Sequence, residues 1–126
     1  MMYLIDTNIF LEILLKQNKN QDCKVFLSNN IGNLFISDFS LHSIGVILFR
    51  QDYNKLYKKF IEDVLPEVNI VTLPKDDYSE ILKIKDKFDL DFDDSYQYCI
   101  SDIYNYKLVT LDKDFVDLDG IDIKFI

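Results

Sequence analysis

The chain has 126 residues, 48% of them hydrophobic, and a formal net charge of −8 at pH 7. A chain of this size and composition can bury one core, so we expect a single domain over residues 1–126. The acidic balance excludes a protein that holds nucleic acid by a general basic surface, because such binding depends on neutralising phosphates with Lys and Arg. It does not exclude a nuclease, because a cation held by converging carboxylates reverses the local charge and can receive a phosphate.

The cysteines and the lack of long apolar runs indicate in which cellular compartment we expect the protein. Cys23, Cys99 and the single histidine are too few for a disulfide framework or a zinc motif, so we expect reduced core thiols. No basic leader precedes Asp6, and no run of about 18 apolar residues is present. We therefore expect a cytoplasmic protein without membrane contact.

The first stretch, MMYLIDTNIFLE, predicts a strand that turns directly into a helix. Its segment YLI is a short run of β-formers, Asp6-Thr7-Asn8 supplies N-cap chemistry, and apolar residues then recur at helical spacing over about 7–17. In an open α/β sheet, ligands bind at such junctions. Taken alone, Asp6 is also explained as an ordinary helix cap.

Strand-like and helix-like segments alternate along the rest of the chain. We predict a helix around Cys23 and further helices at 39–51, 53–64, 76–88 and after the acidic run 89–94, with strands at 34–36, 68–73, 107–110 and 121–125. This alternation is typical of a parallel sheet covered on both faces. The segment 39–51 is apolar on almost every side, so we expect that helix to be largely buried.

Three aspartates stand at places that a parallel sheet brings to one edge. Asp6 follows the first strand, Asp94 begins a late helix, and Asp112 follows the strand at 107–110. Like charges repel in a partly desolvated site, so such a cluster is normally held by a cation. All-oxygen ligation favours Mg²⁺ or Mn²⁺ over zinc.

These motifs carry a resemblance to a known family. The segments LIDTN around Asp6, Asp93-Asp94 at a helix start, and LVTLDKDF around Asp112 resemble the PIN-domain family, with VapC-type toxins the nearest kind, and the 18-residue spacing from Asp94 to Asp112 is similar too. The resemblance implies an α/β/α sandwich around a parallel sheet of four to five strands. It also implies a Mg²⁺- or Mn²⁺-dependent ribonuclease, with an RNA substrate, a small antitoxin partner and homodimerisation.

The resemblance assigns roles to individual residues. The metal ligands and catalytic residues that it implies are Asp6, Asp94 and Asp112, with Asp114 as a further acidic position and Asn8 and Thr110 as supporting polar residues. Asp114 would act through water or cap the segment that follows it.

One position departs from the family pattern. A glutamate usually follows the second strand in the first turns of the next helix, and Ser43 stands at that place. Ser43 can hold a metal-bound water, and the neighbouring His42 can contact phosphate or serve as an ordinary helix residue. Asp91 and Asp93 either compensate for the missing carboxylate or favour the N-terminus of the next helix.

Two functions therefore stay open. The first is an endoribonuclease of the toxin type, in which a metal-activated water hydrolyses the phosphodiester. The second is a catalytically degenerate PIN-like module that binds RNA or a protein partner without turnover. A phosphatase-like hydrolase with Asp6 as nucleophile fits less well, because Asp6-Thr7-Asn8 lacks an Asp-x-Asp arrangement.

Overall fold

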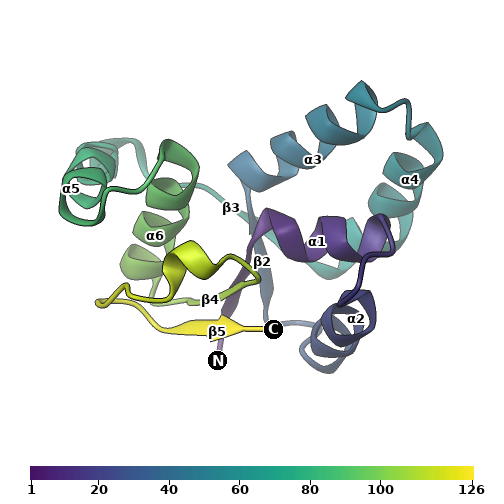
Figure 1. The fold of residues 1–126 in the computed structure, drawn as a ribbon, viewed down its shortest axis with the longest axis horizontal. Helices are drawn as coiled ribbons and strands as arrows, with labels where there is room; N and C mark the ends of the chain where they lie inside the picture. The colour runs from purple at the N-terminus through teal and green to yellow at the C-terminus, as the bar shows by residue number, and fades with distance from the viewer.

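The computed structural model describes residues 1–126 and contains one five-stranded sheet (Figure 1). The strands are β1 (Tyr3–Ile5), β2 (Leu34–Ser37), β3 (Asn69–Val71), β4 (Lys107–Thr110) and β5 (Ile123–Phe125). All neighbours pair in parallel, in the order β3-β2-β1-β4-β5. The order reverses between β1 and β4, and in open parallel sheets the crevice beyond the carboxyl ends of two such strands is where ligands bind.

Six α-helices cover the sheet. They are α1 (Thr7–Leu14), α2 (Asn20–Asn29), α3 (Asp38–Arg50), α4 (Asn54–Lys59), α5 (Ser79–Phe88) and α6 (Phe92–Tyr104). None of them has both the length and the apolar character needed to cross a bilayer. In Figure 1, α5 and α6 lie on one side of the sheet and α1 to α4 on the other. The predicted α/β/α sandwich with a parallel sheet is confirmed.

Alternation along the central strands creates two separate cores. In β1, Leu4 packs with the buried side chains of α5 and α6, whereas its neighbour Ile5 packs with those of α1 and α3. In β4, Leu108 and Val109 divide between the two cores in the same way. Successive strand residues point to opposite faces, so short apolar strands of this kind require helices on both sides. Both cysteines are free and buried, as expected.

The helix predicted at 53–64 is present to Val64, but it changes type in its second half. Helix α4 ends at Lys59, a π-helical turn covers Phe60–Val64, and a 3₁₀ turn covers Leu65–Glu67. Pro66 lies within that last turn and has no amide hydrogen to donate to an α-helical bond. The predicted strand at 68–73 is correspondingly shorter, with only Asn69–Val71 paired to β2.

Helix α3 is less buried than its sequence predicts. Its buried residues are Ser40, Ile44 and Leu48, whereas Phe49 is 60% exposed. One stripe of α3 packs into the core around α1, and the opposite stripe lines an open groove of about 660 Å³ between α3 and α4. The Phe49 ring rests edge-on against Tyr57 in this groove, with ring centroids 5.1 Å apart.

Candidate metal site

Asp6 lies at the carboxyl end of β1 and is the N-cap of α1. Its Oδ1 accepts a hydrogen bond from the backbone N–H of Thr7 at 2.8 Å, so the predicted helix cap is confirmed. The residue is only 7% exposed, which is unusual for a carboxylate without a cationic partner. Capping alone does not require that burial, because most N-caps lie at the surface.

Side chains from two other elements hold the rest of the Asp6 carboxylate. The Thr110 hydroxyl, at the end of β4, donates to Oδ2 at 2.7 Å, and the Asn8 amide donates to the same oxygen at 3.2 Å. The Gln97 amide, on α6, donates to Oδ1 at 3.4 Å. Each Asp6 oxygen therefore accepts two hydrogen bonds, all of them from neutral donors.

Asn8 joins the first helix to the loop after β4. Its Oδ1 accepts from the backbone N–H of Leu111 at 3.2 Å, while its Nδ2 lies 3.4 Å from the Thr110 hydroxyl. In turn, the Thr110 Oγ1 accepts from the backbone N–H of Asp112 at 2.9 Å. The supporting polar residues predicted from the sequence, Asn8 and Thr110, thus fix the segment that carries Asp112.

Caps orient the remaining acidic residues. The Asp91 side chain is the N-cap of α6 and accepts from the backbone N–H of Asp94 at 3.0 Å. The Asp112 Oδ1 accepts from the backbone N–H of Asp114 at 2.9 Å, which starts a 3₁₀ turn over Lys113–Phe115. Both turns project their carboxylates beyond the edge of the sheet.

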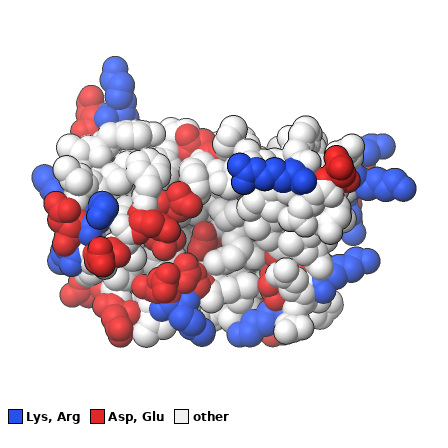
Figure 2. Space-filling model, turned by 45° about the horizontal axis from the view of Figure 1, so that its top comes forward, with Lys and Arg blue, Asp and Glu red and all other residues white.

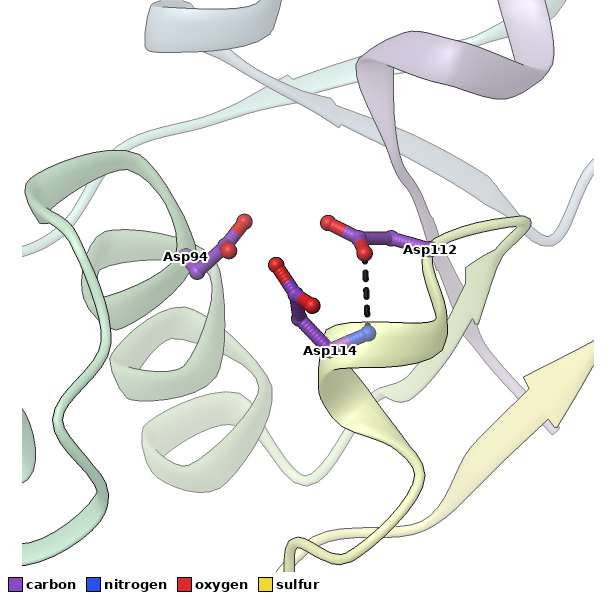
Figure 3. A group of neighbouring side chains, drawn as sticks. All are labelled: Asp94, Asp112 and Asp114. Atoms are coloured by element: carbon purple, nitrogen blue, oxygen red, sulfur yellow. Dashed lines mark hydrogen bonds between the residues drawn. The ribbon is translucent and has the colours of Figure 1, made fainter.

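Three carboxylates converge at this place (Figure 3). Asp94, Asp112 and Asp114 each offer an oxygen, and these oxygens all lie within 4.8 Å of one another. The donor set is entirely carboxylate and partly exposed, which fits a hard divalent cation such as Mg²⁺ or Mn²⁺. Figure 2 shows acidic side chains gathered over the left half and centre of one face, with most Lys and Arg toward its rim.

The pKa values of this region reflect burial first and the crowding of negative charge second. Burial, followed by the nearby charges of Asp91, Asp112, Asp6 and Asp114, raises the pKa of Asp94 to about 7. Burial also raises the pKa of Asp6, and its hydrogen bonds from Thr110, Gln97 and Thr7 act in the opposite direction. A raised carboxyl pKa shows that the ionised form lacks a compensating positive charge. A bound cation would supply that charge.

The structure separates the sequence-predicted residues into two groups. Asp94, Asp112 and Asp114 form the group that converges, and Asp6 lies beside it within a hydrogen-bonded network. Asp91 caps α6, and the pKa of Asp93 is raised by burial and then by the charge of Asp91. The converging group contains no residue of α3, so Ser43 and His42 add no carboxylate or imidazole to it. His42 is exposed and lines the groove beside α4.

Two buried residues of the site escaped the sequence analysis. Gln97 and Ser40 are 1% and 0% exposed, and the Gln97 amide donates to both Asp6 and the Ser40 hydroxyl. The available signal was the placement of Gln97 within the otherwise apolar segment YQYCI of the helix predicted after the acidic run. A long polar side chain in such a position requires a buried partner.

The fold and this site together define a class of proteins. It comprises parallel α/β sandwiches with an oxygen-rich acidic site at the point where the strand order reverses. Comparison of the sequence with protein families narrows the class, because the profile described as PIN domain matches residues 3–121. The chain belongs to the PIN domain family, which confirms the resemblance seen in the sequence. A comparison with curated proteins finds no match.

Solved structures show the same fold at low sequence identity. A toxin-antitoxin complex from Klebsiella pneumoniae matches with a TM-score of 0.77 at 19% identity, covering 94% of each chain. FitAcB from Neisseria gonorrhoeae matches with 0.78 at 17% identity, covering 99% of this chain and 97% of that one. DNA-bound VapBC from Salmonella typhimurium matches with 0.81 at 14% identity, covering 99% and 98%.

Proposed function

We propose that this protein is a Mg²⁺- or Mn²⁺-dependent endoribonuclease of the toxin type, acting in a toxin–antitoxin pair. The observation that carries the proposal is the convergence of the Asp94, Asp112 and Asp114 oxygens within 4.8 Å beside the buried Asp6. Membership of the PIN domain family supports nuclease chemistry at that place. The chain contains no nucleophilic triad or phosphate-binding glycine loop that would point to another reaction.

We assign the following roles to the acidic residues of the site. Asp6, Asp94 and Asp112 would hold the cation, with Asp114, which converges with Asp94 and Asp112, as a further ligand. When bound, the cation activates a water and neutralises charge that builds on the phosphate. In its absence the converging carboxylates repel a phosphodiester, so RNA would approach this edge productively only after the cation is bound.

We also propose an antitoxin as the partner and the cytoplasm as the location. The similar structures from Klebsiella pneumoniae and Salmonella typhimurium are described as toxin-antitoxin and VapBC complexes, which supports a partner of that kind. The open groove between α3 and α4, with Phe49 60% exposed, is an apolar surface on which a partner helix could pack. Homodimerisation is part of the same proposal.

Cleavage of RNA by the purified protein tests the activity. We expect cleavage of a mixed-sequence RNA with Mn²⁺ or Mg²⁺, no cleavage with EDTA, and loss of cleavage in Asp94→Asn. Asp86→Asn, at an aspartate on the last turn of α5 outside the cluster, is the matched control and should retain full activity. Equal activity in the parent and Asp94→Asn, or none at any metal concentration, would refute the catalytic proposal.

Ser43 favours the second candidate, a PIN module that binds without turnover. The position normally held by a glutamate offers only a hydroxyl, and no residue of α3 joins the acidic cluster. Ser43→Glu should tighten Mn²⁺ binding by about 10-fold if the added carboxylate reaches the cation, which is the scale of changes around metal sites. Isothermal titration measures that affinity. Cleavage that arises only in Ser43→Glu identifies the parent as the degenerate form.

A further inference from the structure

Four of the polar residues buried in the core form one connected set next to the acidic cluster. The fully or almost fully buried polar residues are Asp6, Ser37, Ser40, Ser95, Gln97, Ser101 and Thr110. Asp6, Ser40, Gln97 and Thr110 are joined to one another by side-chain hydrogen bonds. Because unconnected polar groups are costly in a core, this concentration at one place indicates a specific task.

Gln97 is the centre of that set. It lies on α6 one helical turn after Asp94, and its Nε2 donates to the Ser40 hydroxyl at 2.8 Å and to Asp6 Oδ1 at 3.4 Å. Ser40 also accepts from the Thr7 hydroxyl at 2.7 Å. The amide therefore links α6, which carries a cluster carboxylate, to α3 and to the start of α1.

The geometry does not match that of a side chain that merely fills space. The Gln97 Oε1 is buried and has no hydrogen-bond partner, so the residue carries an unsatisfied acceptor that Leu or Met would avoid. In this position the amide nitrogen of Gln97 donates a hydrogen bond to Asp6 Oδ1. A donor at this place holds the carboxylate in one orientation and favours its charged form without introducing a competing cation.

The side chains that donate to Asp6 are uncharged, and this matters because the acidic cluster lies next to Asp6. A lysine or arginine placed against Asp6 would form an ion pair and reduce the negative field that attracts a metal ion. The amides of Gln97 and Asn8 and the hydroxyl of Thr110 instead orient Asp6 and leave its full charge in place. No lysine or arginine forms a salt bridge with Asp6 or with the three cluster carboxylates.

We propose that Gln97 is a positioning residue for the cation site: anchored by Ser40, its amide holds the Asp6 carboxylate behind Asp94, Asp112 and Asp114. This inference rests on the proposed function for the identity of the ligand, a divalent cation. It adds that the site depends on a glutamine and a serine that do not touch the metal. The hydrogen bond between Gln97 and Ser40 joins α6 to α3.

Titration of Mn²⁺ alone into the purified, metal-free chain tests the inference. Gln97→Met, which keeps the bulk and removes the amide, should weaken Mn²⁺ binding about 10-fold, within the range seen when residues behind metal ligands are removed. Ser40→Ala removes the anchor of the amide and should weaken binding by a smaller factor, about 3-fold. The double variant should bind no more weakly than Gln97→Met, because both changes act through one amide.

Ser101→Ala is the matched control. Ser101 lies on the same helix one turn beyond Gln97, is 1% exposed and also has an unpartnered side-chain oxygen, but it makes no contact with Asp6. It should leave Mn²⁺ affinity unchanged. Urea denaturation of each metal-free variant gives its stability separately, and if Gln97→Met does not fold, Ser40→Ala carries the test.

Each outcome bears on the inference. A Gln97→Met or Ser40→Ala affinity within 2-fold of the parent, a loss equal to that of Ser101→Ala, or additive losses in the double variant overturns it. A parent that binds Mn²⁺ without cleaving RNA overturns the proposed function alone. A parent that binds no Mn²⁺ overturns both.

Discussion

Asp6 and the group Asp94, Asp112 and Asp114 contain the same side chain in opposite situations. Asp6 is 7% exposed, and each of its oxygens accepts two hydrogen bonds from neutral groups of the chain. The other three carboxylates face one another with oxygens within 4.8 Å, and Asp114 is exposed. The protein satisfies the first carboxylate itself and leaves the other three short of positive charge.

The difference means that Asp6 contributes to the stability of the fold, whereas the three cluster carboxylates contribute to metal binding. Removing Asp6 leaves buried donors without an acceptor, which costs folding free energy. Removing the carboxylate of Asp94 or Asp114, neither of which accepts a hydrogen bond from the chain, relieves repulsion in the metal-free protein and removes only a metal ligand. Substitutions of aspartate in the two regions should therefore have opposite effects on the metal-free protein.

The largest expected effect is on catalysis by the cluster. Asp112→Asn keeps the shape of the side chain but removes a charged ligand, so we expect the rate of Mn²⁺-dependent RNA cleavage to fall by about 100-fold or more. A gel assay with labelled RNA measures it. Asp117→Asn changes an exposed aspartate outside the cluster and should cleave like the parent. Similar losses in both variants would remove the distinction between cluster and surface.

A smaller effect is expected on the free energy of unfolding, and its sign differs between Asp6 and the cluster. Asp6→Ala removes the α1 cap and the acceptor for Thr110 and Gln97, so it should lower the unfolding free energy by about 1–3 kcal/mol. Asp114→Ala should leave it unchanged or raise it slightly. Urea denaturation in EDTA compares the two variants. Equal destabilisation would show that the cluster is also part of the structural framework.

The smallest effect is a pH dependence of the metal-free protein. The folded pKa of Asp94, about 7, lies above the ordinary aspartate value of 3.8, so the folded chain holds this proton more tightly than the unfolded chain. The resulting stabilisation is present below about pH 4 and is lost as pH rises toward 7. Relative to the parent, Asp94→Asn should thus gain melting temperature as pH rises through this window, by about 2–4 °C. Differential scanning fluorimetry in EDTA at several pH values measures the gap, and a constant gap would contradict the raised pKa.

The alternation of strands and helices and the gathering of aspartates at one edge of the sheet were predictable because both follow from local chemistry. The strands β1, β2 and β4 are short apolar runs that end at or just before a capping residue, and parallel strands bring such ends to one edge. Asp6 and Asp112 could be found in this way, whereas Asp94 was found from the acidic run that opens a helix. Asp114 was only a further candidate in the sequence, and its place in the cluster follows from the 3₁₀ turn that Asp112 caps.

What the sequence could not provide was the set of partners that lie far apart in the chain. The bonds from Gln97 to Asp6 and to Ser40 join residues separated by 91 and 57 positions, and no periodicity encodes them. The exposure of Phe49 was missed for a related reason. An apolar helix surface indicates burial, but only the packing of neighbouring helices decides which stripe is covered.

The central position of β1 has a consequence for the order of events during synthesis. Strand β1 is made first, yet Leu4 pairs with Leu108, and Asn8 accepts a hydrogen bond from Leu111. A nascent chain that lacks its last strands has one edge of β1 unpaired and neither Asp112 nor Asp114. The acidic cluster therefore cannot assemble before the chain has been translated past Asp114, which places the appearance of the site after the formation of the first helices. A ribosome-bound fragment that ends before β4 contains α1 to α5 but lacks the complete set of metal ligands.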